Sequence, residues 1–138
     1  MRFVDTNILR YSLDLEPAQP DKSDIAREIL TGTDLVLSVQ VLQEFYEQAT
    51  HSRRPDALPR DIAELLIRKW LRFRIQENTV AVLQSAPSIK QRFQLSDWDA
   101  NIIAAAKAAR CKEVLSEDLS HGQDYGGVTV VNPFFRNN

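Results

Sequence analysis

The sequence contains one cysteine, two histidines and no long hydrophobic run. The single cysteine, Cys111, excludes an internal disulfide and any cysteine-rich zinc site. We expect a buried structural thiol, because Cys111 stands between a helix-like run and a strand-like run. Residues 1–17 lack the unbroken apolar core of a signal peptide, and no stretch approaches the ~18 apolar residues of a membrane span. We therefore expect a cytoplasmic protein that does not enter a membrane.

The length and composition are those of an ordinary soluble protein, but the charge is unevenly distributed. The 138 residues predict one domain, residues 1–138, with 43% hydrophobic and 26% charged residues. The net charge is −2, yet residues 53–74 contain seven Lys or Arg against three Asp or Glu, whereas residues 1–52 contain four against nine. Residues 53–74 are therefore a basic segment in an otherwise acidic protein.

Short apolar runs alternate along the chain with segments of helical periodicity, and there are no repeats or low-complexity segments. This alternation predicts an α/β fold with a central, mainly parallel sheet of four or five strands. The predicted strands are residues 2–5, 34–39, 113–118 and 128–131, and the predicted helices are residues 23–30, 40–50, 61–73 and 96–110.

Prolines and small polar residues predict where helices begin and break. Residues 16–24 read as a proline-containing loop, at the end of which Ser23 or Asp24 would cap a helix. Farther along the chain, Pro87 predicts a break or kink near Ala86.

Acidic residues follow the predicted strands or lie near the start of the helices that come after them. Ligands of open parallel sheets bind beyond the carboxyl ends of the strands, so these side chains are expected at one edge of the sheet. They are Asp5, Glu44, Asp97, Asp99, Glu117 and Asp118.

Carboxylates that gather at one edge repel one another and raise each other's pKa unless a cation lies among them. A divalent ion is the natural counter-charge, and hard oxygen ligands without a histidine or cysteine cluster favour Mg²⁺ or Mn²⁺ over zinc. Such a site can activate a water and stabilise the charge that builds on a phosphodiester.

Each acid also has an ordinary structural explanation. Asp5 could be a turn residue, and Glu44 could be solvated on an amphipathic helix. Asp97 and Asp99 could cap a helix and interact favourably with its dipole, and the acids that end the strand at 113–118 could belong to a loop. Spacing alone leaves both interpretations open.

Four segments of the sequence match a known family in order and spacing. They read "FVDTNIL", "LSVQVLQEFYEQAT", "LSDWDANIIAAAKAARC" and "VLSEDLSHGQ…VTVVNPF". Together they cover nearly the whole chain and resemble the PIN-domain ribonucleases, specifically the VapC-type toxins of type II toxin–antitoxin pairs. The resemblance implies a Rossmann-like α/β/α sandwich, an endoribonuclease dependent on Mg²⁺ or Mn²⁺, a homodimer, and a cognate antitoxin that blocks the site.

The resemblance also implies roles for individual residues. Thr6 and Asn7 match the polar pair that steadies the first acid, and Ser116 matches a small hydroxyl residue near the fourth. Glu117 stands next to that fourth acid as a further supporting residue. The catalytic acids of the family fall on Asp5, Glu44, Asp99 and Asp118, of which Asp5, Asp99 and Asp118 would be metal ligands and Glu44 a further candidate.

The sequence departs from the family pattern at two positions. Position 97 is Asp where relatives often have an aromatic or polar residue, so Asp97 and Asp99 could share or contest the metal. Asn101 stands where an apolar residue is more usual. Neither departure removes a ligand.

The basic segment suits an RNA substrate. Arg53 and Arg54 are expected in a loop, where they could contact phosphates. Trp70 and Phe73 could stack on bases, but their helical spacing favours a place in the core. The same helix could equally contact a second copy of the chain or the antitoxin.

Three functions of different classes remain open. The first is metal-dependent hydrolysis of RNA, and the second is a module that keeps the fold without catalysis, which the full set of acids disfavours. The third is an aspartyl phosphotransferase with Asp5 as nucleophile. That chemistry normally needs a second Asp two residues later, where this chain has Asn7.

Overall fold

The centre of the structure, a computed structural model that describes residues 1–13 and 19–135, is a five-stranded sheet. All neighbouring strands are parallel, and Phe3 lies opposite Val36 on one side and Val114 on the other. The predicted α/β fold with a parallel sheet of four or five strands is confirmed. The strands are β1 (Arg2–Val4), β2 (Leu35–Ser38), β3 (Arg74–Gln76), β4 (Glu113–Leu115) and β5 (Thr129–Val131), in the order β3-β2-β1-β4-β5.

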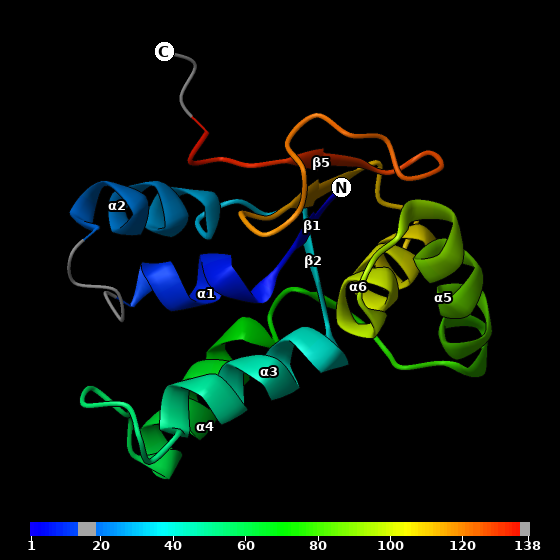
Figure 1. The fold of residues 1–138 in the computed structure, drawn as a ribbon. Coiled ribbons are helices and arrows are strands. Elements are labelled where there is room, and N and C mark those ends of the chain that lie inside the picture. Colours follow the sequence, from blue (N-terminus) through cyan, green and yellow to red (C-terminus); the bar gives the residue numbers. More distant parts are fainter. Residues whose placement is uncertain (14–18, 136–138) are drawn as a thin grey trace.

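Helices cover both faces of this sheet and complete an α/β/α arrangement. Helices α1 to α4 lie on one side, and α5 and α6 pack together on the other (Figure 1). None of the described helices is long and apolar enough to cross a membrane. The helices are α1 (Thr6–Ser12), α2 (Pro20–Ile29), α3 (Val39–Thr50), α4 (Arg60–Trp70), α5 (Val80–Phe93) and α6 (Asp97–Ala108).

The strand order reverses between β1 and β4. From β1 the chain adds β2 and β3 on one side, and then returns to place β4 and β5 on the other side of β1. In open α/β sheets, ligands bind at such a switch point, beyond the carboxyl ends of the strands. The residues that follow β1 and β4 therefore meet where the fold favours a site.

The β2–α3 unit shows how the sequence produces this architecture. All four residues of β2 are buried, as expected for an inner strand of a parallel sheet that is covered on both faces. The chain turns directly into α3, because the Ser38 hydroxyl caps the helix by accepting the N–H of Val41 at 3.1 Å. The predicted strand at 34–39 and helix at 40–50 agree with β2 and α3.

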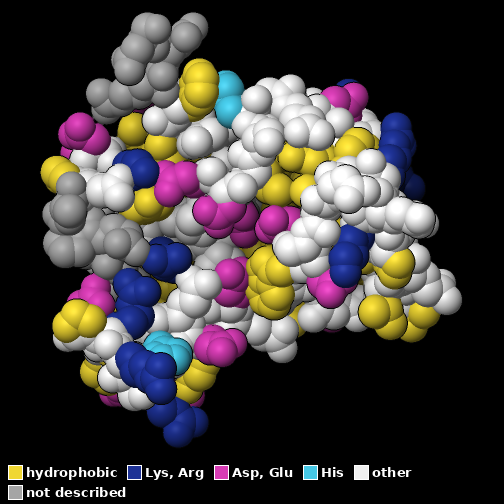
Figure 2. Space-filling model, in the orientation of Figure 1, with side chains coloured by type: hydrophobic (Ala, Val, Ile, Leu, Met, Phe, Trp, Pro, Cys, Tyr) yellow, Lys and Arg dark blue, Asp and Glu magenta, His cyan; other side chains and the backbone are white. Residues whose placement is uncertain are grey.

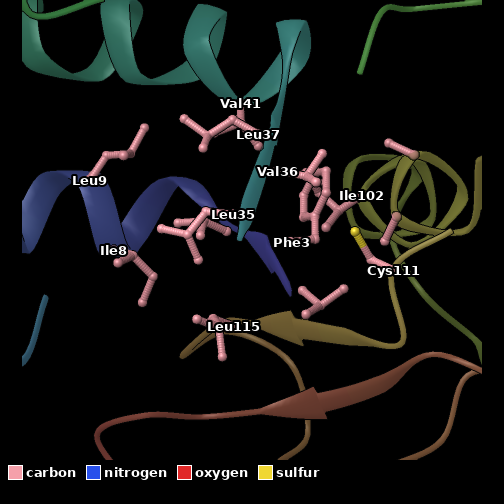
Figure 3. Close-up of a cluster of buried hydrophobic side chains, with 14 of the residues drawn as sticks. Phe3, Ile8, Leu9, Leu35, Val36, Leu37, Val41, Ile102, Cys111 and Leu115 are labelled. Carbon is pink, nitrogen blue, oxygen red and sulfur yellow. The ribbon is translucent and has the colours of Figure 1, made fainter. Parts of the chain in front are cut away.

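The apolar core lies between the sheet and its two helical layers. Phe3, Ile102 and Cys111 meet on the α6 side (Figure 3). Cys111 is the buried thiol expected from the sequence, and burial raises its pKa. On the other side, the Trp70 and Phe45 rings meet edge to face with centroids 4.7 Å apart. The core interpretation of Trp70 is therefore confirmed.

The segment after β1 differs from the sequence prediction. The strand ends at Val4 rather than at Asp5, and Asp5 instead caps α1, a helix that the sequence analysis did not predict. Helix α2 begins at Pro20, so the predicted caps at Ser23 or Asp24 are wrong. Proline fits the first position of a helix because its missing N–H is not needed there. Residues 16–18 of the predicted loop lie outside the described residues.

Two further differences lie between residues 70 and 95. Strand β3 was not predicted, and the helix predicted at 61–73 ends at Trp70. Of the break or kink predicted near Ala86, the break is wrong, because helix α5 continues through Pro87. The proline removes one hydrogen bond to the Leu83 carbonyl. Both residues lie on the exposed side of α5, where water can satisfy that carbonyl, and the opposite side packs against α6.

Candidate active site at the carboxyl edge of the sheet

Four acids from four elements gather beyond the carboxyl ends of β1 and β4. Asp5 follows β1, and its pKa responds to the charges of Glu44 and Asp118. Asp99 lies in the first turn of α6, and its pKa responds to Asp118. Acidic side chains gather in the hollowed centre of this face (Figure 2). The structure thus brings together the four acids that the resemblance assigns to catalysis: Asp5, Glu44, Asp99 and Asp118.

Asp5 is the most enclosed of these acids, with 5% of its surface exposed. Its Oδ1 accepts the Thr6 N–H at 2.7 Å, and its Oδ2 accepts the Ser116 hydroxyl at 2.8 Å. Burial raises the pKa of Asp5 from 3.8 to about 7. The hydrogen bonds from Ser116 and Thr6 oppose this rise, and the charges of Glu44 and Asp118 add to it. Asp5 is therefore a carboxyl group poised to ionise near neutral pH.

Asn7 and Ser116 join the segment after β1 to the segment after β4. The Asn7 amide donates to Asp118 Oδ2 at 3.2 Å, and its carbonyl oxygen accepts the N–H of Glu117 at 3.3 Å. The Ser116 hydroxyl accepts the N–H of Asp118 at 3.1 Å while it donates to Asp5. These bonds hold Asp5 and Asp118 in one fixed arrangement.

Glu44 is held by one hydrogen bond at each carboxylate oxygen. The Thr6 hydroxyl donates to Oε2 at 2.8 Å, and the Gln48 amide donates to Oε1 at 2.8 Å. Gln48 lies one turn farther along α3, so it reaches Glu44 on the same face of the helix. Thr6 and Gln48 therefore orient Glu44 relative to Asp5.

Asp99 is placed by the start of α6. The Ser96 hydroxyl caps this helix by accepting the Asp99 N–H at 3.1 Å. Burial raises the pKa of Asp99, a hydrogen bond with Ser96 opposes the rise, and the charge of Asp118 adds to it. Asp99 therefore senses the same cluster of negative charge as Asp5.

Two acids proposed from the sequence carry their side chains elsewhere. The Asp97 carboxylate is 2.8 Å from Lys90 Nζ on α5 and is largely exposed. The Glu117 carboxylate accepts the Tyr11 hydroxyl at 2.7 Å and pairs with Lys22. Asp97 was expected either to cap α6 or to share the metal with Asp99; Ser96 is the N-cap, and Asp97 lies in the first turn with its carboxylate in a surface ion pair. Glu117 contributes to the site through its backbone N–H.

Arg53 and Arg54 lie in the loop that joins α3 to α4, as expected. Arg53 is exposed, and Arg54 Nε is 3.4 Å from Asp56. Arg53 therefore belongs to the surface and Arg54 is partly buried, whereas Trp70 and Phe73 of the same basic segment belong to the core.

The carboxylate oxygens of the site are candidate ligands for a divalent cation. Within residues 1–13 and 19–135, no group of three or more His, Cys, Asp or Glu side chains is gathered closely enough to hold a metal ion. However, Mg²⁺ usually takes only one or two carboxylates directly and completes its shell with water. The donors here are all oxygen, and burial, with a smaller addition from neighbouring carboxylates, raises the pKa values of Asp5 and Asp99. The donor set therefore fits Mg²⁺ or Mn²⁺ in chemical type.

With this geometry established, the sequence was compared with known families. The model of the PIN domain family matches residues 2–122, a range that contains all four acids of the site. The chain belongs to the PIN domain family. No curated protein matches the sequence.

The backbone of this PIN domain is similar to several solved structures, at identities that show a shared fold. A toxin–antitoxin complex from Klebsiella pneumoniae aligns with a TM-score of 0.68 and 20% identity, over 97% of this chain and 98% of that chain. FitAcB from Neisseria gonorrhoeae aligns with a TM-score of 0.66 and 19% identity, over 96% and 98%. Mycobacterium tuberculosis VapC20, described as a Sarcin-Ricin loop cleaving toxin, aligns with a TM-score of 0.65 and 18% identity, over 86% and 92%.

Three residues that shape the site of this PIN domain were not predicted from the sequence. Gln48 positions Glu44, and the spacing of four residues on a predicted helix was the signal that could have found it. Tyr11 and Lys22 bind Glu117 across 106 and 95 residues of sequence. No local pattern in the sequence predicts those two contacts.

Proposed function

We propose that this PIN domain is a metal-dependent endoribonuclease and the toxin of a type II toxin–antitoxin pair. The observation that carries the proposal is the buried carboxyl of Asp5, held between Ser116 and Thr6 at the switch point of the sheet. The charges of Glu44 and Asp118 act on this carboxyl, and the charge of Asp118 also acts on Asp99. Within the described residues, none of these acids is paired with a lysine or arginine.

The residues of this chain have distinct tasks in that reaction. Asp5, Asp99 and Asp118 would hold Mg²⁺ or Mn²⁺, with Glu44 as a further acid. The bound ion would activate a water and offset the charge that develops on the phosphodiester. Ser116 and Asn7 keep Asp5 and Asp118 in register, so little reorganisation is needed when the ion and the substrate bind. Because the site is acidic (Figure 2), the bound cation would also have to offset the repulsion between these carboxylates and the phosphates of an approaching RNA strand.

The partners follow from the same proposal. The similar structures include a toxin–antitoxin complex from Klebsiella pneumoniae and FitAcB from Neisseria gonorrhoeae. By analogy, a cognate antitoxin covers the site of this PIN domain, and RNA reaches the site only when the antitoxin is absent. A homodimer and a cytoplasmic location belong to the same proposal.

The test is cleavage of total RNA by purified protein with Mg²⁺ or Mn²⁺, together with metal binding measured by calorimetry. Asp5→Asn should remove cleavage and weaken metal binding while the circular dichroism spectrum is retained. Asp24→Asn is the matched control, because its carboxylate is 80% exposed on α2 and pairs with Arg27. If the wild-type protein neither binds metal nor cuts RNA, the nuclease proposal is wrong and a non-catalytic PIN module takes its place.

The toxin assignment has its own test. Induced expression of the wild-type protein should arrest growth, and expression of Asp5→Asn should not. Co-expression of the product of the neighbouring reading frame should restore growth. Growth that continues despite an active nuclease would separate the enzymatic part of the proposal from the toxin part.

A further inference from the structure

Trp98 is an exposed aromatic side chain between the two acids of the first turn of α6. It is 40% exposed, whereas the other tryptophan, Trp70, is 3% exposed and packs against Phe45. Its neighbour Asp99 belongs to the acid cluster, so the indole stands at the rim of the site. A large aromatic ring left open at this rim is available to a ligand.

The indole lines a cavity of about 280 Å³ together with residues of α3 and the residue that follows it. This cavity adjoins the acids, because Glu44 forms part of its wall and also binds Thr6 next to Asp5. The remaining lining residues are Glu47, Gln48 and His51.

The chemistry of these walls selects the kind of group that can enter. The carboxylates of Glu44 and Glu47 repel a phosphate, and the Glu47 carboxylate has no ion pair within the described residues. His51 Nδ1 accepts the Arg53 N–H at 3.2 Å, so the proton of the neutral imidazole is on Nε2, which can donate. One wall thus offers a hydrogen-bond acceptor and a donor beside an aromatic face.

A nucleobase satisfies all these features. Its flat face stacks on indole, and its edge carries both donors and acceptors. A cationic peptide would also find the carboxylates and the indole, but Lys and Arg side chains offer no acceptor to the N–H of His51, whereas the edge of a base offers both donors and acceptors. Dark blue Lys and Arg side chains line the lower-left edge of this face, where they can contact the backbone of a strand that leaves the hollow (Figure 2).

We propose that Trp98 is a stacking platform for one base of single-stranded RNA, next to the acid cluster, with Glu47 and His51 at the edge of that base. The proposal rests on the nuclease function above and adds a specificity-determining residue to it. The stacked base fixes which phosphodiester of the strand reaches the acids.

The first experiment measures binding without cleavage. A seven-nucleotide single-stranded RNA of mixed sequence is titrated into the Asp5→Asn protein, and tryptophan emission is recorded. Because Trp70 is buried, quenching reports Trp98. Affinity is measured in parallel by the fluorescence anisotropy of the same RNA with a 5′ label, and adding Trp98→Ala should weaken binding about 10-fold, the size expected for one lost base–aromatic stack. Trp98→Phe should bind within about 3-fold, because it keeps an aromatic face.

The second experiment uses the active protein. Trp98→Ala should lower kcat/KM on single-stranded RNA about 10-fold while metal binding is unchanged, and Trp98→Phe should restore most of the loss. Leu83→Ala is the matched control, because Leu83 is 67% exposed on α5, and it should leave cleavage unchanged.

Several results would show that Trp98 is not a stacking platform. It is wrong if Trp98→Ala binds and cuts RNA like the wild type, or if both Trp98 variants lose metal binding together with activity. It is also wrong if an arginine-rich peptide quenches Trp98 and RNA does not. A wild-type protein that neither binds nor cuts RNA overturns the platform and the nuclease together. If Asp5→Asn shows Trp98-dependent quenching by RNA but the wild type does not cut, only the nuclease proposal is wrong.

Discussion

Two neighbouring pairs of acids, Asp97–Asp99 at the start of α6 and Glu117–Asp118 after β4, divide their members in the same way. In each pair one acid binds a lysine on another helix, Lys90 for Asp97 and Lys22 for Glu117. The other acid faces the cluster around Asp5. The outer acids are neutralised, and the inner ones have no cationic partner within the described residues.

The role of each acid depends on the direction of its side chain more than on its place in the sequence. Residues two apart in a helix do not share a face, so Asp97 and Asp99 diverge by geometry alone. Lys90 and Lys22 neutralise Asp97 and Glu117 and leave the negative charge of the acid cluster unchanged. The net negative charge that a cation would meet comes from Asp5, Glu44, Asp99 and Asp118.

The largest expected effect separates the two acids of α6. Asp99→Asn should reduce RNA cleavage by about 10³-fold or more, because loss of a metal ligand removes several kcal/mol of transition-state stabilisation. Asp97→Asn should keep cleavage within about 3-fold of wild type, because only an exposed ion pair is lost. Rates are measured under single-turnover conditions.

The stability of these two variants sharpens the same contrast. Asp99→Asn should not unfold the protein, since burial and Asp118 already disfavour ionised Asp99. Comparable losses of cleavage in Asp97→Asn and Asp99→Asn would contradict the division into inner and outer acids.

The pH dependence of the free energy of unfolding probes the buried carboxyl of Asp5. The folded protein keeps Asp5 protonated up to about pH 7, whereas the unfolded chain releases this proton near pH 3.8. The folded state therefore binds the extra proton between these values, and the free energy of unfolding falls as the pH rises through that window. Without metal, the fall attributable to Asp5 should be on the order of 4 kcal/mol.

The measurement is urea denaturation in a chelating buffer at several pH values between 4 and 8. Asp5→Asn should lack this part of the slope and be more stable than the wild type above pH 7. Parallel curves for the two proteins would show that the Asp5 carboxyl does not carry the buried charge.

The smallest effects are expected on the free energy of unfolding, when each of the two lysines is replaced by alanine. Lys22→Ala should lower the free energy of unfolding by about 1 kcal/mol, because Lys22 and Glu117 are each only 26% exposed and Tyr11 binds the same carboxylate. Lys90→Ala should cost less than about 0.5 kcal/mol, since its pair with Asp97 is exposed. Chemical denaturation at neutral pH checks both values, and equal losses would remove the distinction between the two pairs.

The sequence predicted the parallel sheet and its inner strands because they are short, continuous apolar runs. It did not predict β3, whose residues Arg74–Gln76 are partly exposed at the edge of the sheet and carry no such pattern. It also did not predict α1, because Asp5 reads equally well as the end of a strand and as a helix cap. Strand ends and helix starts are the points at which local pattern is weakest.

The position of the acids could be predicted from topology, but their partners could not. The carboxyl ends of parallel strands meet at one edge, which is why Asp5 and Asp118 were expected together. Whether Asp97 turns towards Asp99 or Lys90 depends on how α5 packs against α6, and Pro87 had suggested that α5 was broken. The partner of each acid is therefore set by contacts between helices, which a local sequence pattern does not contain.

The hydrogen bond from Ser116 to Asp5 joins residues 111 positions apart. Ribosomes make a chain from its N-terminus, so Asp5 is synthesised long before the residue that orients it. Until residue 116 has been added, the nascent polypeptide lacks the hydroxyl that links the first acid to the fourth, and until residue 118 has been added it lacks the fourth acid itself. Whatever the finished site cuts, the ribosome that makes this protein does not meet a complete site before that point.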